Sequence, residues 1–198
     1  MTIVMLVLAL GRPLPAINVF DDAGRMRSTG AWKGVPTILV PMYTRCPLAC
    51  PMIVAGMKRG TADARARADS YRVVLFSFDP RDTPADLRAF RERHGVPLAW
   101  TVASAGAADI HRLMEAIDVP VADANGTLMH PNVVVALTPD LKPAKVLVGT
   151  SFDIDAALSI ARGERDWVGQ YGAYALAALI LIATLAAIYA VAAARPAR

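Results

Sequence analysis

The two cysteines of the chain stand four positions apart, and a proline follows each of them. They are Cys46 and Cys50, in the segment Y-T-R-C-P-L-A-C-P that spans residues 43–51. Two thiolates held this close can form a disulfide or chelate a soft ion such as Cu(I). A purely structural disulfide, or two unrelated buried cysteines, is the alternative that the spacing leaves open.

A metal site would need a further ligand, and the histidines are the first candidates. His130 immediately precedes a run that reads as a buried strand, and the loops at strand ends are where a sheet of this kind would face its active turn. Its alternative is a surface or hydrogen-bonded histidine without a ligand role. We expect His94 to end a helix, where a cation is favourable, and His111 to lie exposed beside Arg112.

Other side chains near the cysteines have donor atoms as well. Asp79 ends a predicted strand, and an acid there can cap a helix, form a turn or coordinate a metal. Met42 and Met52 flank the cysteine segment and are soft donors, although methionine in such places usually serves packing.

The cysteines are predicted to lie between a strand and a helix. The apolar run 35–42 predicts a strand that leads directly into the motif. Pro51 suits the first helical position, so the sequence predicts a helix that begins at Cys50 and runs to about Asp69. The partial positive charge at a helix N-terminus favours thiolate over thiol, which predicts a lowered cysteine pKa.

Further elements alternate between strand and helix. Thr83, Pro84 and Asp86 supply an N-cap, a proline and an acid for a helix that ends near Gly95. The other predicted elements are strands at 72–78 and 98–102, a helix at 107–117, a hairpin of strands 133–137 and 145–148, and a helix at 153–162 capped by Ser151. This order predicts an α/β sandwich of thioredoxin-like type.

The charge of the chain does not favour nucleic acid as a partner. The net charge is +4, from 21 basic and 17 acidic residues. The basic side chains of residues 58–67 are spaced like a solvated helix face, with Asp63 among them. No stripe of phosphate-binding residues is present in the sequence.

The C-terminal segment 172–194 contains no charged residue and predicts a transmembrane helix. At ~1.5 Å per residue it is long enough for a hydrocarbon core of ~30 Å. Trp167, Tyr171, Tyr174 and Tyr189 fit interfacial aromatic belts. The alternative is a buried core helix, but such helices seldom lack a polar face over this length.

The expected organisation is a possible signal or truncated signal at 1–11, a domain at 12–165, a linker at 166–171, the membrane helix at 172–194 and a tail at 195–198. The apolar residues 1–10 resemble the core of a secretory signal, but they lack a preceding basic residue and a clear cleavage site. A first strand is the competing interpretation. With a working signal, the domain is expected to face the periplasm or the cell exterior. Without one, the protein is expected to be tail-anchored with its domain in the cytoplasm. The basic residues Arg195 and Arg198 in the tail favour the first arrangement.

Three segments together resemble the Sco/SenC copper chaperones. Residues 43–51 are similar to the family's Y-T-x-C-x-x-x-C-P signature, and residues 76–84 are similar to its S-x-D-P-x-R-D-T-P segment. Residues 21–25 and 32–34 look like the family's opening hairpin and strand entry. The resemblance spans about residues 15–162.

The resemblance implies a thioredoxin-like fold that binds copper through Cys46, Cys50 and His130. It implies a role in assembling the dinuclear copper site of cytochrome c oxidase subunit II, or of another cuproprotein, by metal delivery, by thiol reduction or by both. Asp79 matches a family motif without an assigned role. Two features depart from the family: an apolar residue, Met129, precedes the histidine where an acid is usual, and the anchor is C-terminal.

Two functional classes therefore remain in view. The leading hypothesis is a membrane-tethered copper chaperone. The alternative is a thiol-disulfide oxidoreductase, which needs only the cysteine pair at a suitable redox potential. A peroxidase with a single nucleophilic cysteine fits less well, because the segment lacks the Thr-x-x-Cys arrangement expected of one.

Overall fold

The computed structural model describes residues 12–47, 49–62, 71–124, 127–163 and 176–184. The chain divides into two units, residues 1–163 and 164–198, and each is described by itself. The predicted segment 1–11 and the predicted helix end near Asp69 lie outside the described residues.

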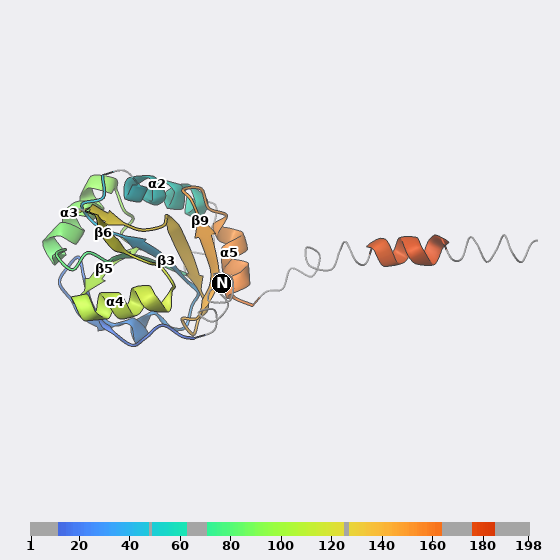
Figure 1. Ribbon diagram of the computed structural model, residues 1–198, viewed down its shortest axis with the longest axis horizontal. Coiled ribbons are helices and arrows are strands. Elements are labelled where there is room, and N and C mark those ends of the chain that lie inside the picture. The colour runs from blue at the N-terminus through green and yellow to red at the C-terminus, as the bar shows by residue number, and fades with distance from the viewer. Residues whose placement is uncertain (1–11, 48, 63–70, 125–126, 164–175, 185–198) are drawn as a thin grey trace, which may run out of the picture. The chain divides into compact units, whose positions relative to one another are not determined.

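The first unit is built on a sheet that has seven strands among the described residues, in the order β2-β1-β5-β4-β3-β8-β9. Figure 1 shows this sheet with helices packed around it. β3, β4 and β5 run parallel, while β1 is antiparallel to β5, and β8 is antiparallel to both β3 and β9. A separate short hairpin pairs β6 with β7. The strands are β1 (Asn18–Asp21), β2 (Met26–Ser28), β3 (Thr37–Met42), β4 (Arg72–Ser77), β5 (Thr101–Ala105), β6 (Ala122–Ala124), β7 (Thr127–Met129), β8 (Val133–Leu137) and β9 (Pro143–Val148).

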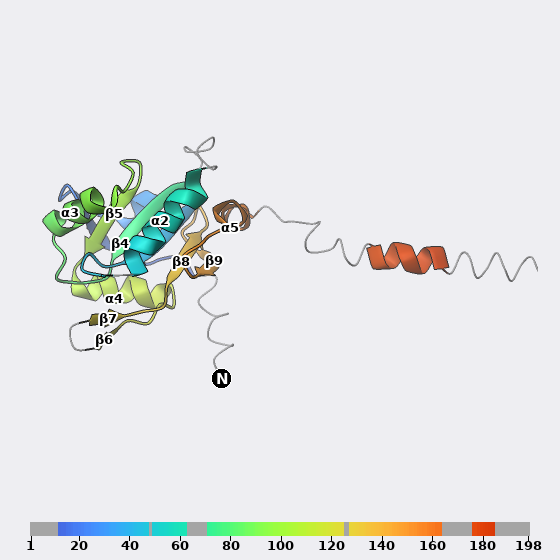
Figure 2. The same ribbon diagram turned by 90° about the horizontal axis from the view of Figure 1, so that it is seen from above.

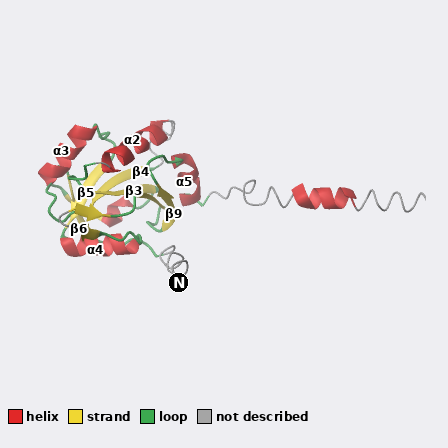
Figure 3. Cartoon of the chain, turned by 45° about the horizontal axis from the view of Figure 1, so that its top comes forward, coloured by secondary structure: helices red, strands yellow, loops and turns green. Residues whose placement is uncertain are grey.

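Helices cover both faces of this sheet. They are the 3-10 helix η1 (Thr29–Trp32) and the α-helices α2 (Ala49–Ala62), α3 (Pro84–His94), α4 (Ala107–Ala116) and α5 (Ile154–Ala161). α2 connects β3 to its parallel neighbour β4, and α3 connects β4 to its parallel neighbour β5. Both connections step in the same direction across the sheet, so right-handed crossovers place both helices on the same face. α4 lies on the opposite face, and α5 packs on the face of α2 (Figures 2 and 3). The predicted α/β thioredoxin-like sandwich is confirmed.

β3 is the strand that leads to the cysteines, and it is buried along its whole length. A central strand rarely contains proline, because proline cannot donate a ladder hydrogen bond. Pro41 is tolerated here because β8 pairs only with Thr37, Ile38 and Leu39, so the proline lies beyond the end of that pairing. The strand therefore keeps its place in the core up to the point where the cysteine turn begins.

The helix α3 begins as the sequence predicts. The Thr83 hydroxyl accepts from the Asp86 N–H, and the Asp86 carboxylate accepts from the Thr83 N–H in return, with Pro84 in the first turn. Gly95 ends the helix with φ at 56°, in the left-handed region that favours glycine.

Several predicted boundaries differ from the structure, and the start of β5 and the cap of α5 are two for which the physical reason is clear. The strand expected at 98–102 is β5, which begins three residues later at Thr101, because a turn closed by the Trp100 N–H and the Pro97 carbonyl leaves Leu98 exposed to 92%. The last helix is capped by Asp153, whose carboxylate accepts from the Ala156 N–H, rather than by Ser151.

α2 is held close to the segment between β9 and α5 by two glycines one helical turn apart. A Cβ added at Gly56 would lie 2.0 Å from the Thr150 carbonyl oxygen. One added at Gly60 would lie 2.8 Å from the Phe152 carbonyl oxygen. Only glycine permits this approach, which fixes the helix that carries Cys50.

In the second unit, residues 176–184 form a helix. Among the described residues, no helix combines the length and the apolar character needed to cross a membrane. The rest of the predicted segment 172–194 lies outside the described residues, so the transmembrane helix stays a prediction.

Candidate metal centre

The cysteines occupy the turn between β3 and α2, at the carboxyl ends of the central parallel strands. The Cys46 N–H donates to the Tyr43 carbonyl and closes the turn. α2 begins at Ala49, one residue before the predicted start, so Cys50 lies in its first turn.

The two cysteines have different surroundings. Cys46 is half-buried, whereas Cys50 is completely buried. The Cys50 N–H donates to the Cys46 Sγ over 3.3 Å. Its side-chain hydrogen bond to Cys46, together with burial, raises the pKa of the Cys50 thiol. The predicted lowering of the pKa at the helix N-terminus is therefore wrong for Cys50, and Cys46 is the sulfur more accessible to a partner.

His130 lies between β7 and β8 and packs against aromatic rings from two other segments. The imidazole and the Phe78 ring are 4.7 Å apart between centroids, and the Tyr43 ring is 6.2 Å away, both in edge-on contacts. Tyr43 follows β3 and Phe78 follows β4, so the two strands that end at the site also supply the surface on which the histidine rests.

The hydrogen bond of His130 leaves one ring nitrogen available. Nδ1 lies 2.9 Å from the Pro131 carbonyl oxygen, which can only accept, so Nδ1 carries the proton. In the neutral ring the Nε2 lone pair is then the one left for a metal. Burial lowers the pKa of His130, although the Pro131 carbonyl and the Cys46 charge oppose this shift, so the ring stays neutral to a lower pH than usual.

Tyr43 joins the histidine to Cys46, the half-buried cysteine. Burial raises the pKa of the Tyr43 hydroxyl, and the charge of Cys46 and a side-chain hydrogen bond to it act in the same direction. The same residue thus contacts both Cys46 and His130. Sequence reasoning missed Tyr43 and Phe78 as parts of the site, although both belong to the motifs that contain Cys46 and Asp79.

The structure brings Cys46 and Cys50 into direct contact, and the Tyr43 ring lies between this pair and His130 in the chain of contacts. Among the residues that the structure describes, no three histidine, cysteine, aspartate or glutamate side chains are grouped closely enough to hold a metal ion. The set of two sulfurs and one imidazole nitrogen has the chemistry that suits Cu(I). Cys46, Cys50 and His130 as metal ligands therefore stay a prediction.

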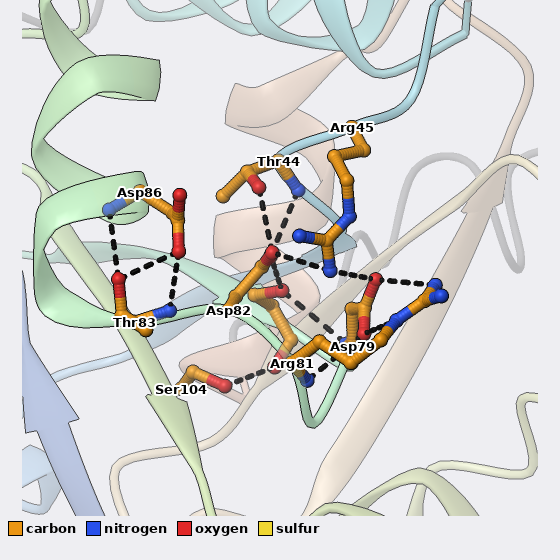
Figure 4. A network of polar contacts seen from close by, with 9 residues as sticks. Thr44, Arg45, Asp79, Arg81, Asp82, Thr83, Asp86 and Ser104 are labelled. Carbon is orange, nitrogen blue, oxygen red and sulfur yellow. Dashed lines mark hydrogen bonds and ion pairs between the residues drawn. The ribbon is translucent and has the colours of Figure 1, made fainter.

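Asp79 lies beneath the cysteine turn with its side chain completely buried (Figure 4). Its carboxylate pairs with Arg45 over 2.6 Å and with Arg81 over 2.9 Å. Burial alone would raise its pKa, but the hydrogen bonds from Arg81 and Arg45 outweigh that effect and lower the pKa to about 2. Three roles were considered for Asp79: capping a helix, forming a turn or coordinating a metal. The structure supports turn formation after β4, because the Asp79 carboxylate accepts from the Arg81 N–H two residues later.

The remaining candidates have packing or surface roles. Met42 is completely buried in the core, whereas Met52 is exposed to 48%. His94 is the last residue of α3, as predicted, and His111 is exposed on α4, as predicted.

The SCO1/SenC family model matches residues 16–162 of the chain, which include the cysteine turn, Asp79 and His130. The chain belongs to the SCO1/SenC family.

Known proteins resemble this SCO1/SenC chain in sequence and in structure. A Stutzerimonas stutzeri protein named "Putative copper-binding protein" is 29% identical over 126 residues, 62% of this chain and 60% of that protein. The chain thus spans about 60% of the length of this curated relative.

Two solved structures share the fold. A "putative electron transfer protein" from Aquifex aeolicus VF5 superposes with a TM-score of 0.71 at 32% identity, over 79% of this chain and 96% of that one. Bradyrhizobium japonicum ScoI with copper bound superposes with a TM-score of 0.65 at 21% identity, over 76% of this chain and 99% of that one.

In this SCO1/SenC chain an apolar residue precedes His130, so a different group must orient the imidazole. The residue before the imidazole is Met129, which is exposed to 58%. The imidazole is instead held by the hydrogen bond that its Nδ1–H donates to the Pro131 backbone carbonyl. A carbonyl partner sets the tautomer of a metal-binding histidine as a carboxylate does.

Proposed function

We propose that this protein is a copper chaperone that carries Cu(I) on Cys46, Cys50 and His130. Its recipient is the dinuclear copper site of cytochrome c oxidase subunit II or another cuproprotein. The observation that supports this most is the contact between Cys46 and Cys50, next to a Tyr43 side chain that hydrogen-bonds to Cys46 and also packs against His130. Membership of the SCO1/SenC family and the copper-bound relative support the choice of metal.

The unequal burial of the two thiols suits transfer of a cargo ion. Three ligands leave a Cu(I) ion open to a fourth, so a recipient thiol can bind before the donor ligands leave. Cys46 is the more exposed sulfur, and we expect the recipient to approach on its side. Cys50 stays in the first turn of α2 and holds the ion until the transfer is complete.

Reconstitution with Cu(I) under anaerobic conditions tests the proposal. We expect one ion per chain, loss of binding in Cys46→Ala and in Cys50→Ala, and weakened binding in His130→Ala. His111→Ala is the matched control, because it removes an exposed imidazole from α4. Unchanged stoichiometry in both cysteine variants would refute the proposal.

A thiol-disulfide oxidoreductase is the second candidate, and the contact between Cys46 and Cys50 favours it. A reductase needs the two thiols alone, whereas a copper site also needs the imidazole. Reduction of a disulfide in a recipient peptide by His130→Ala separates the two functions. Full activity in that variant, together with unchanged copper affinity, supports the reductase.

We also propose that the uncharged segment 172–194 tethers the domain to a membrane, with the domain facing the periplasm or the cell exterior. Expression of the full chain in bacteria, followed by membrane fractionation, tests the tether. Protease added to spheroplasts tests the orientation. A domain recovered in the soluble fraction contradicts the tether, and a domain protected until lysis contradicts the orientation.

A further inference from the structure

Beneath the cysteine turn, Asp82 is the point at which several donors meet (Figure 4). Its side chain is only 3% exposed. One carboxylate oxygen accepts the Thr44 N–H over 2.9 Å and the Ser77 hydroxyl over 2.5 Å. The other accepts the Thr44 hydroxyl over 2.6 Å. Thr44 is two residues before Cys46, so this carboxylate binds the beginning of the turn, which we call the Thr44–Cys46 turn.

Asp82 is itself tied to the sheet. Ser77 ends β4, and the Ser104 hydroxyl of β5 donates to the Ser77 carbonyl over 2.9 Å. The hydrogen bonds thus run without interruption from two central strands through Asp82 to Thr44. These hydrogen bonds connect the Thr44–Cys46 turn to the sheet, and neither cysteine takes part in them.

Arg45 adds a second link, directly before Cys46. One of its guanidinium nitrogens lies 2.6 Å from Asp79 and 3.2 Å from Asp82, so it bridges two buried carboxylates. Its side chain is nevertheless 47% exposed. Arg81 also binds Asp79, but it follows β4 and is not part of the turn.

The chemistry of this site requires a carboxylate at position 82. The Asp82 carboxylate accepts hydrogen bonds from one N–H and two hydroxyls, and it forms an ion pair with the Arg45 guanidinium. A carboxylate offers only acceptors, whereas an asparagine side chain would turn its own NH₂ toward at least one of these donors. An unmatched donor at a buried position is unfavourable, so the turn would shift.

We propose that Asp82 and Arg45 are positioning residues that place the Cys46 sulfur against Cys50 and His130, and so set the affinity for Cu(I). This inference rests on the proposed function for its copper readout. A residue that only stabilised the domain would act equally on every part of it. Asp82 and Arg45 hold the Thr44–Cys46 turn in place, so their loss should displace the Cys46 sulfur.

Arg45→Met and Arg81→Met form a matched pair for the test. Each removes one cation from Asp79 and leaves a side chain of similar length, and the wild-type arginines are exposed to 47% and 54%. Of the two arginines, only Arg45 belongs to the Thr44–Cys46 turn and also pairs with Asp82. Competition with a chromogenic Cu(I) chelator measures the affinity, and thermal unfolding measures the stability of each variant.

We expect Arg45→Met to weaken Cu(I) binding by about tenfold or more at unchanged stoichiometry. Arg81→Met should stay within about twofold of wild type, with a similar unfolding midpoint for the two variants. Thr44→Val, which removes a hydroxyl at nearly constant volume, should weaken binding in the same direction. Arg45→Lys keeps the cation and should recover part of the affinity. Equal copper affinities in Arg45→Met and Arg81→Met overturn the inference.

A measurement without copper separates this inference from the proposed function. The equilibrium between the Cys46–Cys50 dithiol and its disulfide, set in a buffer of oxidised and reduced dithiothreitol, depends on the placement of the same sulfur. We expect Arg45→Met to change this equilibrium constant by about threefold or more and Arg81→Met to leave it unchanged. If wild type binds no copper but this difference appears, the proposed function fails and the positioning role stands. If wild type binds copper and neither readout separates the variants, the positioning role fails.

Discussion

Gly56 provides a test of the packing that holds the cysteine-bearing helix. Gly56→Ala places a methyl group in the interior of α2, where alanine is favoured over glycine by about 1 kcal/mol. Without a tertiary contact, the substitution would therefore stabilise the protein. The structure predicts the opposite sign, because the new Cβ would lie 2.0 Å from the Thr150 carbonyl oxygen and 3.0 Å from its carbonyl carbon.

The size of the effect follows from which atoms must move. Both close atoms of Thr150 belong to the backbone, so no side-chain rotation relieves the contact. Overpacking a well-filled core costs about 1–3 kcal/mol, and a contact this short belongs at the upper end of that range. After the helix-propensity gain of about 1 kcal/mol, we expect a net loss of about 2 kcal/mol, or about 4–8 °C in Tm for a domain of this size.

Urea and thermal unfolding of Gly56→Ala measure this loss. Gly30→Ala is the control, because a Cβ there would meet only the Ser28 hydroxyl at 3.5 Å, an ordinary contact. Copper affinity should fall along with stability in Gly56→Ala, because α2 carries Cys50. A Gly56→Ala protein as stable as wild type, or more stable, would refute the close approach of α2 to Thr150.

Three further predictions concern charge and helix caps. The pKa of Asp79 is about 2 in the folded protein, below its ordinary value of 3.8, so its stabilisation is complete above about pH 4 and is lost as the pH falls toward 2. Urea unfolding should show that wild type loses about 2 kcal/mol more than Asp79→Asn over this interval. Thr83→Ala removes the α3 cap and should lower the unfolding free energy by about 1 kcal/mol, and a loss near zero would contradict the capping box. Asp153→Ala should cost about 1 kcal/mol and Ser151→Ala almost nothing, whereas the reverse order would restore Ser151 as the cap.

The parts of the fold that the sequence predicted depend on local chemistry. The cap of α3 involves three neighbouring residues, Thr83, Pro84 and Asp86, and their side chains determine the helix start without help from the rest of the chain. The start of β5 does not depend on local chemistry in this way. Leu98 is apolar and was expected in the strand, but the turn from Pro97 to Trp100 leaves it in solvent. Hydrophobic pattern alone does not distinguish such a leucine from one in a strand.

The candidate site divides in a similar way. Cys46 and Cys50 were found from their spacing, and His130 was singled out by the strand that follows it and by the family resemblance. The contacts of His130 with Phe78 and Tyr43 join segments far apart in the chain, so no local pattern indicates them. The high pKa of Cys50 was missed for a related reason: the favourable helix N-terminus was visible in the sequence, but burial and the partner sulfur were not.

The ligand set of bound Cu(I) is the central claim, and X-ray absorption at the copper edge tests it most directly. Protein loaded anaerobically with one equivalent of Cu(I) should show two sulfur scatterers and one nitrogen scatterer, and His130→Ala should lose the nitrogen and keep both sulfurs. A spectrum with sulfur ligands alone in wild type, unchanged in His130→Ala, would contradict the assignment of Cys46, Cys50 and His130 as the copper site.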